Sequence, residues 1–334
     1  MNQRILFIAN DRDGCFQYRT NIPYQFLKDH IKYCNLELNP ISEITSKYFN
    51  YDVFIFQRPH TPYLYTNFFK WCRLNKKKII IDIDDNLFQI PSCNPAYNFW
   101  TPDVLQNLKE NLEIADAITC STIPLYHYLS TIISNPNKIT IIPNMLVDVL
   151  PYKENNDNDK IKIGWSGSPS HFGDFSNELI LELKRLVEKN IIDFEIFGIV
   201  PDFLKGIATE IPWVNVEHYM TTLYNLNWDI GLIVCKDNPL NESKSNLKYL
   251  EYSACSIVSI ADNVYPYTTS INKDCGIIIE KQTDWKKQIG MLIKNKEKIN
   301  EYKQSAYNNV NYHYTFVHQH QSFYRLWWNV LARL

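Results

Sequence analysis

The sequence Lys244-Ser245-Asn246-Leu247-Lys248-Tyr249-Leu250-Glu251-Tyr252 has the pattern of a helix start, and the prediction of an α/β fold rests on it. Ser245 and Asn246 belong to the residue types that cap helices, and a helical pattern continues from there through Ala254. Residues 229–234 form a short apolar run that is typical of a buried strand, and a polar loop at 236–243 follows it. A strand that leads through a loop into a helix is the repeating unit of a parallel α/β sheet.

The same stretch has the properties of a phosphate site. A helix N-terminus presents unpaired backbone N–H groups and a partial positive charge, which together favour an anion. Lys244 and Lys248 lie at this end, where the helix dipole disfavours positive charge and a bound phosphate would remove the conflict. Glu251, further along the helix, can accept two hydrogen bonds from a ribose diol. The alternative is a capped surface helix with solvated lysines.

Residues 229–254 resemble the donor-nucleotide motif of GT-B glycosyltransferases, especially the sugar-nucleotide-dependent transferases of glycosyltransferase family 4, including those that build bacterial surface glycans. That family carries two glutamates at this helix. Glu251 matches the second glutamate, which holds the ribose, whereas Ser243 stands in place of the first, which contacts the donor sugar or lies near it. The resemblance implies that the backbone amides of Asn246 and Leu247 hold the diphosphate.

Length and composition narrow the class of protein. The chain has 334 residues, enough for two domains, and 45% of them are hydrophobic, enough for sizeable cores. A formal net charge of -2 gives no electrostatic case for a nucleic-acid partner. The 8 cysteines form no C-x-x-C pair, which argues against a zinc site and a disulfide framework and fits the cytosol. We see no leader pattern and no run long enough to span a membrane, so we expect a cytoplasmic protein whose membrane contact is at most peripheral.

Apolar runs alternate with amphipathic helical patterns over residues 1–152, which predicts a Rossmann-like, doubly wound α/β domain. Residues 153–160 are hydrophilic and are predicted to be a linker. The pattern then restarts and predicts a second Rossmann-like domain over 161–311, so that two domains face a cleft. The strands that we expect cover residues 4–10, 52–57, 78–85, 117–120, 141–144, 161–168, 194–198, 214–217, 229–234, 255–261 and 275–280.

Residues 312–334 are aromatic-rich and have a helical pattern. The GT-B resemblance implies that this C-terminal helix returns toward the N-terminal domain, with Trp327 and Trp328 packed at the junction. A helix on a membrane surface is the alternative, and the basic segment 281–303 could touch anionic lipid.

A second candidate for the donor site ends the first strand of the second domain. Gly167 lets the backbone approach a ligand, and Ser168 supplies a hydroxyl. This loop resembles the corresponding loop of family 4-like transferases, which often carry an arginine–lysine pair nearby. That pair is missing here, so Lys244 and Lys248 would do its work, because a lysine can neutralise the charge of a departing diphosphate. A plain strand–helix turn is the alternative.

Ligands of doubly wound sheets bind beyond the carboxyl ends of the strands. For the nucleotide base, the resemblance points to the ends of the next two strands, which carry Phe197, Gly198 and His218. It does not distinguish uracil from guanine or thymine. His171, just after the Ser168 turn, could hydrogen-bond the donor or lie on the surface.

Three carboxylates, Asp82, Asp84 and Asp85, end a strand of the first domain. Close carboxylates repel, so one of such a pair can have a raised pKa that suits acid–base catalysis. We therefore take Asp84 and Asp85 as candidate catalytic residues, together with Lys244, and capping of the next helix as the alternative. GT-B transferases generally need no bound metal, so we expect none here.

The acceptor side is predicted from the ends of the first two strands. The loop at 11–17 contains Asp13 and Gly14, which the resemblance places near the reaction centre. Arg19 and Arg58 could each bind an acceptor phosphate or carboxylate with two hydrogen bonds, and surface salt bridges are the alternative for both.

These observations together predict a glycosyltransferase that moves a sugar from a nucleoside diphosphate sugar to a hydroxyl of a glycan or lipid-linked acceptor. The setting would be surface-polysaccharide synthesis in the cytoplasm, at the inner face of the membrane, with the donor as co-substrate and no further cofactor. Family 4 members retain the anomeric configuration, whereas an inverting enzyme would use Asp84 or Asp85 as a base. Two rivals stay open: an enzyme like the sugar-nucleotide 2-epimerases, and a non-catalytic subunit that binds a nucleotide sugar or glycan.

Overall fold

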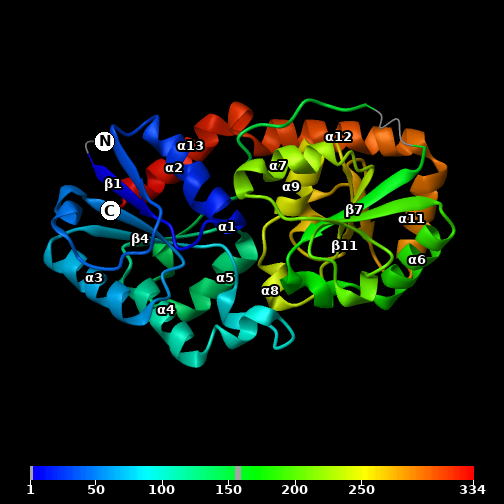
Figure 1. Ribbon diagram of the computed structural model, residues 1–334. Helices are drawn as coiled ribbons and strands as arrows, with labels where there is room; N and C mark the ends of the chain where they lie inside the picture. Colours follow the sequence, from blue (N-terminus) through cyan, green and yellow to red (C-terminus); the bar gives the residue numbers. More distant parts are fainter. Residues whose placement is uncertain (1–2, 155–158) are drawn as a thin grey trace.

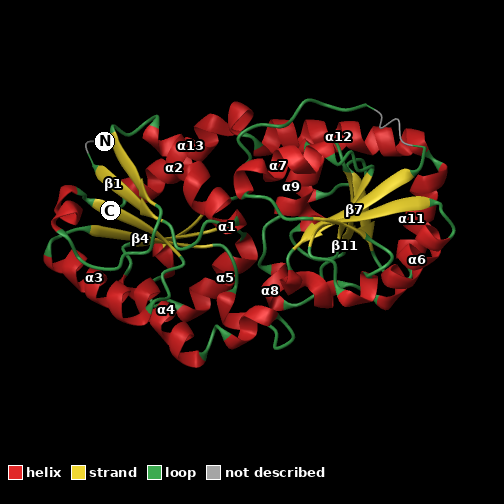
Figure 2. Ribbon diagram, in the orientation of Figure 1, coloured by secondary structure: helices red, strands yellow, loops and turns green. Residues whose placement is uncertain are grey.

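The computed structural model describes residues 3–154 and 159–334, which form two α/β domains lying next to each other (Figure 1). Each domain is built on a sheet of six strands with helices on both sides (Figure 2). Of the linker predicted at 153–160, residues 155–158 lie outside the described part of the chain.

The first sheet has the order β2-β1-β3-β4-β5-β6, and all its neighbouring strands are parallel. Its strands are β1 Arg4–Ile8, β2 Tyr33–Glu37, β3 Val53–Gln57, β4 Lys78–Ile83, β5 Ala117–Cys120 and β6 Ile139–Ile141. Strand β3 is buried at every position because helices cover both faces, which is why its sequence is a continuous apolar run. The edge strand β2 was not predicted, because its partly exposed, polar sequence gives no such run.

Helices α2 and α13 pack on one face of this sheet, and α3, α4 and α5 pack on the other. The helices are α1 Gly14–Phe16, α2 Ile22–Lys28, α3 Pro62–Leu74, α4 Pro102–Ile114 and α5 Ile123–Ile132, with short turns η1 Gln17–Asn21, η2 Ser46–Asn50, η3 Leu87–Gln89, η4 Pro95–Asn98 and η5 Pro136–Lys138. Thr101 and Thr122 cap α4 and α5 through their side chains. The loop expected at 11–17 is shorter than predicted, because helical structure begins at Gly14.

The second sheet has the order β12-β11-β10-β7-β8-β9 and is also parallel throughout. Its strands are β7 Ile161–Gly167, β8 Ile192–Gly198, β9 Thr209–Ile211, β10 Ile230–Ile233, β11 Val258–Asp262 and β12 Gly276–Ile279. The strand order reverses between β7 and β10. At such a switch point the loops leave in opposite directions and open a crevice at the carboxyl ends of the strands. The two expected Rossmann-like domains are confirmed.

Helices α6 and α11 cover one face of the second sheet, and α7, α9 and α12 cover the other. The helices and turns are η6 Pro169–Asp174, α6 Asn177–Glu188, η7 Asp202–Leu204, α7 Val216–Asn225, α8 Pro239–Glu242, α9 Leu247–Ala254, α10 Tyr267–Ser270, α11 Asp284–Lys294, α12 Lys296–Tyr314 and α13 Phe316–Ala332. The strand predicted at 214–217 is wrong: these residues lead into α7, and the edge strand is β9. The loop predicted at 236–243 contains the short helix α8.

The C-terminal helices connect the two domains. Helix α12 packs on α9 in the second domain, and α13 continues from it onto the first domain beside α2 (Figure 1). The Trp327 side chain is fully buried there, with its ring 6.0 Å from that of Phe7. Trp328 is 41% exposed, so the expectation that both tryptophans pack inside is wrong for Trp328. Adjacent positions of a helix point in directions about 100° apart, and only one of the two can face the sheet.

Candidate active site

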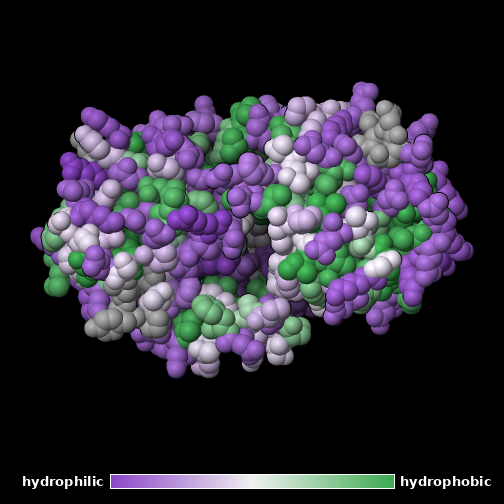
Figure 3. Space-filling view, viewed as in Figure 1, coloured by the Kyte–Doolittle hydropathy of each residue, from purple (hydrophilic) through white to green (hydrophobic). Residues whose placement is uncertain are grey.

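The two domains contact each other at the carboxyl edges of their sheets, through the loop between α8 and α9. Thr122 Oγ1 donates a hydrogen bond to the Ser243 carbonyl at 2.7 Å, and Asn144 Nδ2 donates to Ser245 Oγ at 2.8 Å. Figure 3 shows the surface hollowed between the two domains. Ser243 is 3% exposed, and its hydroxyl donates to the Pro239 carbonyl. The residue that stands in place of the family's first glutamate therefore serves the contact between the domains.

Helix α9 begins beside this contact, at the crevice between β7 and β10. Its first backbone hydrogen bond runs from the Leu250 N–H to the Asn246 carbonyl, so the amides of the first turn precede the helical ladder. Asn246 occupies the N-cap position, but its side chain does not cap the helix and instead donates to Ser270 Oγ at 2.9 Å. Within the described part of the chain, no side chain caps this turn, which leaves the backbone donors of the phosphate hypothesis, those of Asn246 and Leu247 among them, to a ligand.

Lys244 is held at this turn by a chain of hydrogen bonds. Its ammonium lies 3.0 Å from His171 Nε2, and His171 Nδ1 lies 2.9 Å from Asp174 Oδ2. Asn241 Nδ2 donates to the other carboxylate oxygen of Asp174 at 3.2 Å. Burial, together with the nearby Lys244 charge, lowers the pKa of His171 to about 3, so the imidazole is neutral and accepts from the lysine. His171 is therefore a half-buried member of this hydrogen-bonded series and not a surface residue.

Lys248 approaches the same crevice from the first turn of α9. Its ammonium donates to the Ser166 carbonyl near the end of β7 and lies 5.4 Å from the centre of the Trp165 ring. Burial lowers the pKa of Lys248 to about 8, and the nearby Glu251 opposes that effect. The structure thus brings together the two lysines, the α9 amides and the end of β7, as the sequence predicted.

The Glu251 carboxylate lies inside the molecule, 6% exposed, between two tyrosines from different domains. Tyr18 of the first domain donates to Oε1 at 2.8 Å, and Tyr219 of the second donates to Oε2 at 3.1 Å. Burial raises the pKa of Glu251, while the hydrogen bond from Tyr18 and the charge of Lys248 oppose the rise. A ribose that binds Glu251 would share or replace these hydroxyl contacts.

An aromatic surface borders the end of β8. The buried Phe197 ring stacks on Tyr219 at 5.2 Å, and the 45% exposed Trp213 lies 5.5 Å from Phe197. Gly198 has a φ of +135°, and a Cβ there would lie 2.7 Å from the Gly167 carbonyl, so only glycine lets these two strand ends approach so closely.

Two other residues assigned to the donor side lie differently. His218 is exposed in the first turn of α7, so the reason for choosing it, a place at the end of a strand, is absent. Ser168 is exposed after β7, with its hydroxyl 2.6 Å from that of Ser170. Ser168 thus remains at the mouth of the crevice, whereas His218 does not have the predicted position.

On the first-domain side, Arg19 is a structural residue. Its side chain is 2% exposed and makes a two-bond ion pair with Asp82, at 2.9 and 2.7 Å. Its remaining terminal nitrogen donates to the Ile142 carbonyl at 2.6 Å and to Asn144 Oδ1 at 2.9 Å. Because these partners use the guanidinium inside the domain, the assignment of Arg19 to acceptor binding is corrected.

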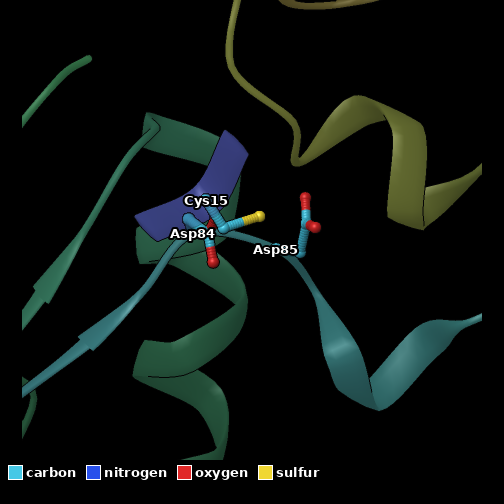
Figure 4. Close-up of side chains that lie close together, drawn as sticks. All are labelled: Cys15, Asp84 and Asp85. Atoms are coloured by element: carbon cyan, nitrogen blue, oxygen red, sulfur yellow. The ribbon is translucent and has the colours of Figure 1, made fainter. Parts of the chain in front are cut away.

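Arg58 lies among the aspartates predicted to be catalytic. Its guanidinium donates to Asp84 and, at 2.9 Å, to Asp85, and it lies 3.2 Å from Cys15 Sγ. Cys15 comes from α1 and the two aspartates from the segment after β4 (Figure 4). Arg58 has a φ of 42°, an uncommon conformation that persists only where surrounding contacts hold it.

The ion pair changes the expected electrostatics of the aspartates. Burial raises the pKa of Asp84, but the charge and hydrogen bond of Arg58 outweigh burial and bring that pKa below its ordinary value. The expectation of a raised pKa is therefore wrong for Asp84. The ligand atoms of Cys15, Asp84 and Asp85 lie within 4.8 Å of one another, a spacing that could hold a metal ion. Arg58 already supplies a positive charge to this cluster.

Asp13 and Gly14 are exposed at the start of α1, in the same segment as Cys15. The Asp13 backbone is tied to Asp11, whose Oδ1 accepts from the Asp13 N–H at 3.1 Å. The side chain of Asp85 is 28% exposed and that of Asp84 is 11% exposed. Asp13 and Gly14 are therefore the accessible members of the predicted acceptor side, and Asp85 is the more exposed of the two predicted catalytic aspartates.

No family model and no curated protein sequence matches the chain. Solved structures do match it along its whole length. HepE from Anabaena, solved with UDP and glucose, is 11% identical and superposes with a TM-score of 0.71, covering 99% of this chain and 100% of that chain. Sucrose-phosphate synthase from Thermosynechococcus elongatus is 11% identical, with a TM-score of 0.66 and the same coverage of 99% and 100%. A glycosyltransferase from Rickettsia africae is 12% identical, with a TM-score of 0.64 over 99% of both chains.

The chain has the GT-B fold. At these identities the likeness concerns the arrangement of the backbone, and it confirms the fold expected from residues 229–254. In this GT-B chain the β7–β10 crevice lies in the second domain, and the group of Arg58, Asp84, Asp85 and Cys15 lies in the first. The two domains contact each other through Ser243. Among residues 3–154 and 159–334, no helix is long and apolar enough to span a bilayer.

Sequence reasoning assigned no role to three residues of the candidate site, Tyr18, Trp213 and Asp174. Tyr18 lies at an apolar position of a helical pattern, where a hydroxyl group leaves no signal. Tyr219 was expected at the end of a strand, whereas the structure places it in α7. Trp213 lies between β9 and α7, in the stretch whose secondary structure was predicted wrongly. Asp174 follows His171 by three positions, a spacing that suits a contact within one turn and could have indicated the pair.

Proposed function

We propose that the protein is a glycosyltransferase that transfers a sugar from a UDP-sugar to a hydroxyl group of a glycan or lipid-linked acceptor. The observation that carries this proposal is the crevice between β7 and β10, where the first turn of α9, Lys244 and Lys248 converge. Backbone donors and two ammonium groups at one helix N-terminus suit a diphosphate. UDP is the nucleotide of choice because HepE, which shares the fold, was solved with UDP.

Each part of the donor has a matching group in the second domain. The α9 amides and the two lysines face the diphosphate, and Glu251 faces the ribose hydroxyls. The exposed ring of Trp213, beside Phe197 and Gly198, offers a flat surface to the base. We expect the Ser168 hydroxyl and the Gly167 backbone to border the phosphates at the end of β7.

Transfer breaks the bond between the anomeric carbon and the oxygen of the β-phosphate, and the electron pair leaves with UDP. A new bond forms between that carbon and the acceptor oxygen, and the proton of the acceptor hydroxyl passes to the Asp85 carboxylate. Lys244 and Lys248 stabilise the charge that develops on the departing diphosphate, a role that needs preorganised cations rather than a bound metal.

The acceptor approaches from the first domain. Asp85, the more exposed of the paired aspartates, accepts a hydrogen bond from the acceptor hydroxyl, while Arg58 and Asp84 fix its position. Asp13 and Gly14 border the acceptor at the start of α1. We place the reaction in surface-polysaccharide synthesis, in the cytoplasm and with a peripheral contact to the membrane.

Thermal unfolding with a panel of nucleoside diphosphates and their sugars, in the presence of a metal chelator, tests the donor site. A ligand at 100 times its dissociation constant stabilises the folded state by about 2.7 kcal/mol, so UDP should raise the melting temperature clearly. Glu251→Gln should weaken this response. Glu110→Gln, at an exposed position of α4, should leave it unchanged. Absence of a shift with every member of the panel would contradict the proposal.

Product analysis tests the reaction itself. The protein is incubated with a UDP-sugar, with and without a pool of glycan and lipid-linked acceptors. We expect release of UDP that depends on the acceptor, together with a glycosylated product. An altered sugar nucleotide formed without any acceptor would instead identify an epimerase, and tight donor binding without turnover would identify a binding subunit.

A further inference from the structure

The hydrogen-bonded chain that ends at Lys244 joins three segments of the second domain. Asn241 belongs to α8, His171 and Asp174 belong to η6, and Lys244 lies between α8 and α9. The three contacts, at 3.2, 2.9 and 3.0 Å, link the amide of Asn241 to the ammonium of Lys244. Of these four residues, only Lys244 faces the donor in the proposed function.

The carboxylate of Asp174 decides which nitrogen of His171 carries the proton. Asp174 is 9% exposed and accepts from Nδ1, so Nδ1 is the protonated nitrogen and Nε2 keeps its lone pair. That lone pair points at the Lys244 ammonium, which has three N–H donors. One donor is used by His171, and two are left for an anion at the first turn of α9.

The backbone of Lys244 is held as firmly as its side chain. Its N–H donates to the Asn241 carbonyl at 3.2 Å, and both neighbours, Ser243 and Ser245, are hydrogen-bonded to the first domain. A free lysine side chain loses rotamer entropy when it binds a ligand, and a lysine that is already ordered does not. The fixed backbone and side chain of Lys244 therefore suit an ammonium group that binds a ligand at one defined position.

We propose that His171, oriented by Asp174, is a positioning residue that holds the Lys244 ammonium in place for the diphosphate of the donor. This inference rests on the proposed function, because it assumes that a nucleoside diphosphate binds at α9. His171 would not touch the diphosphate, and its effect on binding would pass through Lys244 alone.

A double-mutant cycle with UDP and uridine as probes tests the inference, with affinities from isothermal titration calorimetry. We expect Lys244→Ala to weaken the affinity for UDP about tenfold or more, the scale of one hydrogen bond to a charged group. The affinity for uridine should stay unchanged. His171→Ala should weaken UDP by a similar factor in the presence of Lys244. In the Lys244→Ala background the same change should have no further effect.

His171→Gln guards against a variant that merely unfolds, because the glutamine carbonyl can accept from Lys244 and should keep most of the UDP affinity. His30→Ala is the matched control, since it removes an imidazole that hydrogen-bonds a backbone carbonyl in the first domain at 2.8 Å. Thermal unfolding of each variant reports its folding.

If His171→Ala weakened UDP binding equally with and without Lys244, or weakened uridine binding as much as UDP binding, the role of His171 would be structural and the inference would be overturned. An unchanged UDP affinity in Lys244→Ala would overturn it as well, and both results would leave the donor site standing. Failure of the wild-type protein to bind UDP would instead refute the proposed donor, and the inference with it.

Discussion

Neutralising Asp82 should destabilise the first domain strongly, because its carboxylate is the only partner that balances the buried charge of Arg19 by direct contact among the residues described. Both side chains are 2% exposed, and Thr119 Oγ1 donates a further hydrogen bond to Asp82 Oδ2 at 2.5 Å. In Asp82→Asn the guanidinium stays buried while its counter-charge is lost. Breaking a buried ion pair in this way costs about 3–5 kcal/mol.

The nearby Asp84 also attracts Arg19, so we expect a loss in the lower half of that range. A loss of about 3 kcal/mol lowers the melting temperature of a domain of roughly 150 residues by about 6–12 °C. The assay is thermal and urea unfolding followed by circular dichroism, with the transition of the first domain fitted separately. Asp202→Asn, at an ion pair whose Asp202 side chain is 91% exposed, is the control and should leave the stability unchanged.

The double variant Arg19→Met with Asp82→Leu sharpens the test. Replacing both partners by apolar groups removes the unpaired charge, so the double variant should be more stable than Asp82→Asn. Wild-type stability in Asp82→Asn, together with a raised KM for acceptor in Arg19→Met, would refute this reasoning. Arg19 would then belong to the acceptor site, as the sequence suggested.

Three further predictions concern residues of the donor site. UDP affinity should fall above about pH 8, because burial lowers the pKa of Lys248 from 10.5 to about 8 and the ammonium loses its charge there. Lys248→Arg should remove this fall in calorimetric titrations between pH 7 and 9.5. A fall that persists in Lys248→Arg would exclude Lys248 as its cause. In the same window unfolding should become harder as pH rises, because the unfolded chain binds the Lys248 proton up to a higher pH than the folded chain does. Trp213→Ala should weaken the binding of UDP by about 1–3 kcal/mol, the range for stacking of one base on an aromatic ring, and leave the binding of inorganic pyrophosphate unaffected. Trp328→Ala is the matched control, because Trp328 is 41% exposed and Trp213 is 45% exposed. Equal effects of the two substitutions would argue against a base at Trp213.

The central strands could be predicted from the sequence, whereas two of the edge strands, β2 and β9, could not. Strands β3, β4, β7 and β10 lie between layers of helices, and this environment requires the apolar runs that are visible in the sequence. Strands β2 and β9 pair on one side only and expose polar side chains, so their sequences resemble those of loops.

The candidate site was predictable where its chemistry is local. Lys244, Lys248 and Glu251 lie within one strand–loop–helix unit, and the properties of a helix N-terminus follow from the backbone alone. Arg19 and Arg58 were not predictable in this way. Each arginine has an aspartate partner on or just after β4. The Arg19 side chain is buried inside the first domain, whereas the Arg58 side chain is partly exposed at the edge of that domain.

The two α/β units, the parallel sheets and the phosphate-type helix start follow from local sequence, because periodicity, capping and burial act over a few neighbouring residues. The partners of the charged groups, in contrast, follow from tertiary packing. Tyr18 and Glu251 are 233 positions apart, and His171 and Lys244 are 73 apart. Hydrogen bonds between such residues depend on how strands order within a sheet and how two domains meet, and no local pattern encodes either.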